Sequence, residues 1–211
     1  MQSKRRIYLL SPAHTGGKRA GILLRSEAGF ELAVRLREQG LPIGEVFAFL
    51  SGLYFRGKLA YVDAFASPPE GFAGAFVITS GRGLVPVDTR VTIPDLRELA
   101  TVPIDEDEPR YREPLERTLR ELYDAAGPCD YILLGSVATR KYLDPIAQVL
   151  GDRLLFPEEF IGRGDMSRGG LMLRCAAAGT PLTYVPVGAA TRHGAKPPKL
   201  PRMRTGYSPD R

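Results

Sequence analysis

The sequence predicts a layered α/β domain with a central, largely parallel or mixed sheet flanked by helices, plus an extended basic C-terminal tail. Two observations predict this class. Short apolar runs bounded by glycine or proline recur at wide spacing, and the segments between them repeat apolar residues at helical spacing. We expect a single domain over residues 1–190 and a Pro-rich tail over residues 191–211, because no long linker or internal repeat divides the rest of the chain.

Five apolar runs are expected to be strands. They are continuous rather than alternating, which is typical of strands buried on both faces of a sheet that helices cover. The first run stops at a proline and the next two stop at glycines, which often interrupt regular structure. The expected strands are Arg6–Ser11, Ala75–Ser80, Asp130–Gly135, Arg153–Phe156 and Leu182–Val187.

Helical periodicity predicts five helices, several of which are followed by a glycine where helices commonly end. The expected helices are Glu27–Glu38, Ile43–Phe65, Tyr111–Ala126, Thr139–Leu150 and Met166–Ala178. The second is long and strongly apolar, and Gly52 and Gly57 are positioned to break or bend it. Asp165 is placed to cap the last helix, since an N-cap carboxylate accepts hydrogen bonds from the first helical N–H groups.

The composition is that of an ordinary globular protein, with 211 residues, 44% hydrophobic and 25% charged. This excludes wholesale disorder, collagen-like repeats and a disulfide scaffold. Two cysteines indicate no oxidised framework, so a cytoplasmic location is expected. No apolar run approaches the roughly 18 residues of a membrane span, so no membrane partner is expected. The run Ile7–Leu10 after three basic residues is too short for a signal peptide.

The net charge of +5 is concentrated near the C-terminus. From residue 191 onward, six Lys or Arg residues accompany one Asp, a surplus of five that equals the charge of the whole chain. Such a tail either folds over an acidic partner or stays solvated, and its composition fits both. The acidic run Asp105–Glu108 is interpreted as a solvated loop rather than a metal site.

Four glycine-rich, basic segments lead to the functional prediction. Residues 11–19, 80–83 and 135–141 directly follow expected strands, and the fourth segment spans residues 162–170. Because ligands of open α/β sheets bind beyond the carboxyl ends of the strands, we expect all four segments to face one cleft. Backbone N–H groups, helix N-termini and cationic side chains there would bind phosphate. The alternative is that the glycines only form tight turns and the arginines are solvated.

The residues expected to bind phosphate or nucleic acid come from these segments and from one helix. They are Lys18, Arg19, Arg56, Gly81, Arg82, Gly135, Ser136, Thr139, Lys141, Arg163, Ser167 and Arg168. Arg56 belongs to the stretch Leu53–Tyr61, which contains both aromatic and basic residues, as base stacking with phosphate contact requires. The simpler interpretation of this stretch is a core helix, in which Phe55 and Tyr61 pack inward while Arg56 and Lys58 extend to solvent.

His14 and Asp165 are the candidate catalytic residues. His14 follows the first expected strand, and Asp165 is the one carboxylate in the fourth segment. Residues 12–19 do not form a P-loop, because Pro12 stands in place of glycine and Arg19 in place of Ser or Thr. The sequence has no G-x-S-x-G elbow, no helix-opening G-x-G-x-x-G and no zinc-ligand spacing. We therefore expect no metal and no cofactor.

Several of these pieces, in this order, resemble a known bacterial superfamily. The pieces are the Ser-Pro turn with Lys18, the stretch Leu53–Tyr61, the run Phe-Val-Ile-Thr-Ser-Gly-Arg-Gly-Leu-Val-Pro-Val-Asp over residues 76–88, and Tyr131–Ser136. The superfamily includes the peroxide-stress YaaA proteins. It is similar in fold to uracil-DNA glycosylases and to the middle domain of archaeosine-type transglycosylases. The resemblance spans residues 6–150 and implies a nucleic-acid-linked role.

The sequence departs from the pattern of that superfamily at three points. Arg82 stands where the superfamily has Lys-His before Gly-Leu-Leu, and no helix-hairpin-helix segment is evident. His14 follows the first strand without the Asp or Asn that uracil-type glycosylases use. The resemblance therefore implies nucleic-acid binding without establishing catalysis.

The expected function is nucleic-acid binding, with DNA favoured over RNA, by a glycosylase-like enzyme that excises a modified or damaged base. Such an enzyme holds a flipped nucleotide in a pocket, stabilises charge as the bond breaks and positions a water, which would involve His14 or Asp165. Two alternatives would use the same anion-binding turns. One is an enzyme of glycosyl or phosphoribosyl transfer that acts on a nucleotide or sugar phosphate, and the other is a non-catalytic nucleic-acid-binding module.

Overall fold

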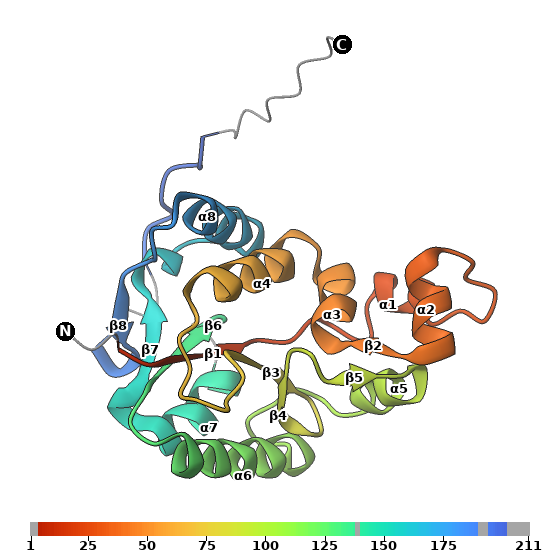
Figure 1. Ribbon diagram of the computed structural model, residues 1–211, viewed down its shortest axis with the longest axis horizontal. Helices are drawn as coiled ribbons and strands as arrows, with labels where there is room; N and C mark the ends of the chain where they lie inside the picture. The colour runs from red at the N-terminus through yellow and green to blue at the C-terminus, as the bar shows by residue number, and fades with distance from the viewer. Residues whose placement is uncertain (1–3, 138–139, 190–193, 202–211) are drawn as a thin grey trace.

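The computed structural model describes residues 4–137, 140–189 and 194–201 and confirms the α/β class (Figure 1). Its centre is a six-stranded sheet with the order β4-β3-β1-β6-β7-β8. These strands are β1 (Arg6–Leu10), β3 (Ala75–Thr79), β4 (Gly83–Pro86), β6 (Asp130–Leu134), β7 (Leu154–Pro157) and β8 (Tyr184–Pro186). A second, small sheet pairs β2 (Leu41–Pro42) with β5 (Arg90–Val91).

Helices cover both faces of the main sheet. They are α1 (Lys18–Leu23), α2 (Glu31–Gln39), α3 (Ile43–Ser51), α4 (Leu53–Phe65), α5 (Ile93–Ala100), α6 (Pro109–Ala126), α7 (Arg140–Leu150) and α8 (Asp165–Ala178). Figure 1 shows α4 and α8 on one side of the sheet and α6 and α7 on the other. This double cover explains the continuous apolar runs of the sequence, since each residue of Ile7–Leu10 is fully buried.

The centre of the sheet is parallel and its edges are antiparallel. β1 pairs in parallel with β3 and β6, and β6 pairs in parallel with β7. The edge strands β4 and β8 are antiparallel to their neighbours. In the register, Leu10 lies opposite both Val77 and Leu134, so β1, β3 and β6 end at the same edge. The segments that follow these three strands are therefore neighbours.

The five expected strands are confirmed, and a turn follows β3 as expected, but strand β4 after this turn was not predicted. Gly83 has φ +68°, in the left-handed region that favours glycine, which lets the chain reverse tightly after β3. The hydroxyl of Thr79 closes the reversal, since it donates to the Gly83 carbonyl at 2.8 Å and accepts from the Arg82 N–H at 3.1 Å. The short helices α1 and α5 were also missed.

The long apolar segment Ile43–Phe65 forms two helices that meet at Gly52. Gly52 has φ +62°, so it ends α3 and begins α4. Gly57 breaks nothing and lies inside α4, where a Cβ would come within 2.6 Å of the Gly169 carbonyl oxygen. In return, a Cβ on Gly169 would meet the Leu53 carbonyl oxygen at 2.7 Å. Gly57 is thus required for the close approach of α4 and α8.

The expected helix ends need two corrections. Gly164, not Asp165, is the N-cap of α8; Asp165 is the first residue inside the helix, and no side chain caps it. The helix expected from Glu27, which is α2, begins at Glu31, after Phe30 in extended conformation. The glycine stops at Gly127 and Gly179 are confirmed.

The described part of the predicted tail, residues 194–201, forms no helix or strand and lies against the protein's own surface. Arg174 of α8 donates to the Pro201 carbonyl at 2.5 Å, and Arg163 donates to the Pro198 carbonyl at 3.4 Å. Residues 190–193 and 202–211 lie outside the described residues, so the boundary at residue 191 stays a prediction.

The contact between α4 and α8 leads to a stability test. We expect Gly57→Ala to lower the free energy of unfolding by about 1–3 kcal/mol, because the added methyl group presses on the Gly169 backbone. Urea unfolding measures the change. The matched control is Gly21→Ala in α1, where a Cβ meets nothing within 4 Å. It should be neutral or stabilising by up to about 1 kcal/mol, and equal losses in both variants would contradict the packing argument.

Candidate functional site

The candidate site lies where two chain connections leave the sheet in opposite directions. From β1 the chain passes through α1–α4 to β3, and from β6 it passes through α7 to β7. β1 and β6 are neighbours, so the connections diverge between them. Open α/β sheets bind ligands at such a switch point, beyond the carboxyl ends of the strands.

Two adjoining cavities open at this switch point. One has a volume of about 370 Å³ and the other about 350 Å³. Both are lined by Pro12, Ala13 and His14 from the turn after β1 and by Lys141 and Tyr142 from α7. Because they share these residues, the cavities are two chambers of one cleft.

The two chambers differ in the chemistry of their other walls. The first, which we term the apolar chamber, has Leu99, Val102 and Ile104 at and beyond the end of α5 on one wall, in addition to the hydroxyl residues Thr15 and Ser80. The second, which we term the polar chamber, is lined by Ser11, Tyr54, Ser136 and Asp165. A ligand that spans the cleft would therefore meet an apolar wall at one end and hydroxyl and carboxylate groups at the other.

His14 is exposed in the turn after β1, on the wall that both chambers share. Two glycines lie directly against its imidazole. A Cβ on Gly17 would be 3.2 Å from Nδ1, and a Cβ on Gly16 would be 3.4 Å from Nε2. Gly16 and Gly17 therefore leave space for the imidazole in this turn.

Asp165 is held at the rim of the polar chamber by its place at the start of α8. Its side chain is 68% exposed, whereas that of Arg168, one turn later, is 10% exposed. The Arg168 Nη1 lies 3.6 Å from Asp165 Oδ1, and Arg168 also donates twice to the Phe160 carbonyl at 3.3 Å. Arg168 is thus anchored to the backbone, while the carboxylate of Asp165 faces the cleft.

Lys58 lies behind the polar chamber, and its burial contradicts the expectation that it extends to solvent. It is 1% exposed. Its Nζ donates to the Ser11 carbonyl at 2.7 Å and to Ser11 Oγ at 2.8 Å, and it lies 4.1 Å from the centroid of the Tyr54 ring. Phe55 and Tyr61 pack inward as predicted, and Arg56 is exposed.

Burial controls the ionisation of the groups behind the polar chamber. It lowers the pKa of Lys58 to about 7, more strongly than the nearby Asp165 charge raises it. Burial also raises the pKa of Tyr54 to about 12, so Tyr54 presents a neutral hydroxyl at neutral pH. A signal for Lys58 existed in the sequence, because Tyr54, Lys58 and Tyr61 recur at helical spacing on one apolar face.

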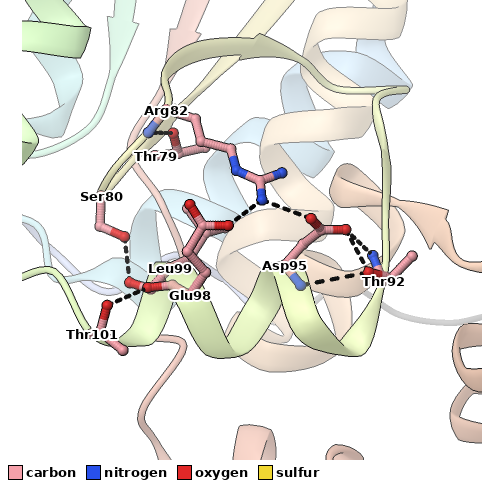
Figure 2. Close-up of polar contacts among 8 residues, drawn as sticks. All are labelled: Thr79, Ser80, Arg82, Thr92, Asp95, Glu98, Leu99 and Thr101. Carbon is pink, nitrogen blue, oxygen red and sulfur yellow. Dashed lines mark hydrogen bonds and ion pairs between the residues drawn. The ribbon is translucent and has the colours of Figure 1, made fainter.

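Arg82, expected to clamp phosphate, is held by carboxylates of α5 (Figure 2). Its Nη2 donates to Asp95 Oδ1 at 2.6 Å and to Glu98. Asp95 also forms the capping box of α5 with Thr92, which lowers the pKa of its carboxyl. Arg82 therefore stabilises α5 through its carboxylates and lines neither chamber.

Apart from Lys141, the other predicted cations also line neither chamber. Arg19 donates to the Phe49 carbonyl at 3.0 Å, and Arg163 donates to the Glu159 carbonyl at 2.9 Å and to Ser167 Oγ at 3.2 Å. Lys18 is exposed on α1. Among the described residues that line the chambers, Lys141 is the one lysine and no arginine occurs.

Each of the four predicted segments contributes a residue to at least one of the two chambers, although neither chamber is lined by all four. The turn after β1 contributes His14, the end of β3 contributes Ser80, the segment after β6 contributes Ser136 and Lys141, and the start of α8 contributes Asp165. The glycines have other contacts. Gly135 packs against Ser11, and Gly81 lies near Val102. Thr139 lies outside the described residues.

The described residues contain neither a metal-binding cluster nor a helix suited to span a membrane. No group of three or more His, Cys, Asp or Glu side chains is arranged to hold a metal ion among them. Within the same residues, no helix has the length and apolar character needed to cross a bilayer.

Comparison of the chain with protein-family models, with curated proteins and with solved structures gives no match. The resemblance to the superfamily of YaaA proteins and uracil-DNA glycosylases therefore stays a prediction.

The burial of Lys58 predicts a specific dependence of stability on pH. Its folded pKa of about 7 lies below the ordinary value of 10.5, so the unfolded chain binds more protons between these pH values. The cost of burying Lys58 is fully present below about pH 7 and disappears above about pH 10.5. Relative to Lys58→Met, the wild-type protein should gain on the order of 4–5 kcal/mol of stability as the pH rises through this window.

Urea unfolding of both proteins at several pH values measures this difference. Groups that do not interact with Lys58 titrate equally in both proteins, so their contributions cancel. A difference that does not vary with pH would mean that Lys58 titrates alike in the folded and unfolded chains, contrary to this account.

Proposed function

We propose that the cleft binds one phosphorylated nucleoside or sugar unit, and that Asp165 and His14 act on the glycosidic bond of this unit. The observation that carries the proposal is the meeting of two chambers at the switch point, where His14, Lys141 and Asp165 line the walls. Chambers of about 370 and 350 Å³ fall within the range of ligand pockets.

Each of these three side chains has a distinct part in the proposed chemistry. Lys141, on the shared wall, would bind the phosphate, since a lysine ammonium is a point charge suited to that group. The carboxylate of Asp165 would stabilise the cationic, sugar-like transition state that forms as a glycosidic bond breaks. His14 would position the attacking water or protonate the leaving group. The hydroxyl of Ser136, on the wall of the polar chamber, would contact the sugar or base.

A free nucleotide or sugar phosphate is favoured over a polymer by the distribution of the arginines. A protein that tracks a nucleic-acid backbone neutralises successive phosphates with Lys and Arg side chains. Arg82, Arg163 and Arg168 are instead engaged by carboxylates, backbone carbonyls and a hydroxyl of the protein itself. A free nucleotide and a nucleotide flipped out of a nucleic acid present the same phosphate, sugar and base to the cleft. The proposal therefore concerns one such unit, whichever its source.

Nucleic-acid binding is retained as a second candidate because of the segment 194–201. Lys196 and Lys199 are exposed on this segment. The segment lies along α8, whose first residue, Asp165, lines the polar chamber. Cations in this position would contact phosphates that flank a nucleotide held in the cleft.

Two substitutions separate binding from chemistry in the proposed site. We expect Lys141→Ala to weaken the binding of nucleoside monophosphates by roughly 10–100-fold, because it removes one charge-assisted hydrogen bond. Asp165→Asn should leave affinity nearly unchanged and lower glycosidic cleavage by orders of magnitude. Calorimetry gives the affinity, and release of free base gives the rate.

The matched control is Arg117→Ala, which removes an exposed cation on α6, across the sheet from α8. It should change neither measurement. Full cleavage activity in a folded Asp165→Asn protein would exclude Asp165 from the chemistry. Equal reductions of affinity in Lys141→Ala and Arg117→Ala would place the phosphate outside the cleft.

The second candidate predicts salt-dependent binding to oligonucleotides. Removal of residues 191–211 should reduce the slope of log affinity against log salt by about 0.9 for each phosphate of duplex DNA that the tail neutralises. The pair Lys196→Ser and Lys199→Ser should reduce it by up to about 1.8 without removing the segment. An unchanged slope in both proteins, or no binding to DNA or RNA, would contradict this candidate.

A further inference from the structure

The hydroxyl of Ser11 and the amine of Lys58 form a buried pair at the end of β1. Ser11 follows the last residue of the strand, and its Oγ lies 2.8 Å from the Lys58 Nζ. The same Nζ is fixed by the Ser11 carbonyl at 2.7 Å, so its orientation toward Ser11 is held at two points. The glycosidic chemistry proposed above uses neither group.

The surroundings of Lys58 favour an uncharged amine. Its polar partners are both on Ser11, and the rings of Tyr54 and Phe55 lie against it. The charged groups that face it come from α8, where Asp165 raises its pKa and Arg168 lowers it. Burial outweighs both and brings the pKa of Lys58 to about 7, so a large fraction of the amine is neutral at neutral pH.

An uncharged amine changes the direction of the hydrogen bond. A lysine ammonium can only donate to Ser11 Oγ, whereas a neutral amine has a lone pair that accepts the Ser11 proton. In the charged state, the hydroxyl of Ser11 has the Leu134 carbonyl, at 3.4 Å, as its acceptor. Loss of one proton from Lys58 therefore turns it from a donor into a base for Ser11.

Ser11, rather than Lys58, is the group that a ligand can reach. Lys58 is 1% exposed and lines neither chamber, whereas Ser11 is 6% exposed and lines the polar chamber. The next residues, Pro12 and Ala13, line both chambers, so Ser11 lies close to their junction. Beyond Pro12 and Ala13, the apolar chamber would offer a nucleophile at Ser11 a wall of Leu99, Val102 and Ile104.

We propose that Ser11 is a nucleophile toward carboxylic esters, that Lys58 is its general base, and that the apolar chamber holds the acyl group. A serine–lysine pair is a known variant of nucleophilic catalysis by serine. This activity goes beyond the proposed glycosidic function, because it requires only that an ester enters the cleft. The alcohol portion of the ester lies in the polar chamber with Ser136 and Asp165.

The reaction is a hydrolysis in two steps. Neutral Lys58 takes the Ser11 proton as Oγ bonds to the ester carbonyl carbon; the carbon–alkoxy bond then breaks, and the leaving alcohol takes that proton from Lys58. Water next attacks the acyl-serine and gives a proton to Lys58. The bond from carbon to Oγ breaks, the carboxylic acid leaves, and Ser11 recovers its proton. No oxidant or metal is consumed.

The test uses the whole chain, a fluorophosphonate probe and p-nitrophenyl butyrate. Peptide mapping by mass spectrometry should place the probe on Ser11. The labelling rate should rise with pH around a midpoint of about 7, as Lys58 loses its proton. Ser11→Ala should abolish labelling and ester hydrolysis, and Lys58→Met should slow both by roughly 100-fold or more, the usual contribution of a general base. The control Ser26→Ala, at an exposed serine beside Glu27, should match the wild-type protein.

Several outcomes would overturn the assignment. They are no adduct, an adduct on another residue, or an unchanged labelling rate in a folded Lys58→Met protein. If Lys58→Met does not fold, the wild-type protein alone tests the assignment. Its rate of labelling at Ser11 is measured between about pH 6 and pH 9. A rate that does not vary over this range would exclude a general base that titrates near neutrality. Calorimetry with nucleoside monophosphates is independent of the probe, so failure of the esterase proposal and failure of the nucleotide proposal are separate results.

Discussion

Two glycines bring the backbones of α4 and α8 into contact, and the positions of the groups around the cleft follow from this approach. Neither Gly57 nor Gly169 has a side chain to separate the helices, and a Cβ on either would press on a carbonyl of the other helix. Lys58, the next residue of α4, is thereby enclosed beside Ser11, and Asp165 at the start of α8 reaches the polar chamber. A larger residue at either glycine would displace Lys58 and Asp165 together.

Desolvation then determines how the buried polar groups behave. Lys58 has hydroxyl, carbonyl and aromatic neighbours, so burial favours its neutral form. A second buried cluster contrasts with it, because the hydroxyls of Tyr8 and Tyr61 both bond to that of Tyr184, at 2.9 and 2.5 Å. Burial raises the pKa of all three tyrosines, which therefore stay neutral and stabilise the fold. Lys58, whose pKa burial brings close to neutral pH, is the buried polar group that lies behind the cleft.

The arginines show why residue type alone did not locate the site. Arg82 and Arg163 occur in glycine-rich turns beside the expected cleft, which is where phosphate-binding groups are commonly found. In the folded chain they stabilise α5 and the contact with segment 194–201, since carboxylates and carbonyls lie within reach. A guanidinium binds whichever acceptor the fold supplies, and for Arg163 these range from the nearby Glu159 carbonyl to the Pro198 carbonyl, which is distant in sequence. Lys141, by contrast, faces the cleft from α7.

The sequence by itself determined the α/β class, the five main strands and the segments that meet at the cleft. Continuous apolar runs report burial on both faces, and parallel strands bring the turns that follow them to one edge. From the sequence, Lys58 was predicted to extend to solvent. Its burial depends on α8, which covers this face of α4 and lies more than a hundred residues away in the chain. Only the tertiary structure decided that this amine faces Ser11, and that the arginines are held by the protein itself. Local periodicity shows which face of a helix is apolar, whereas the partner that covers that face is fixed by packing.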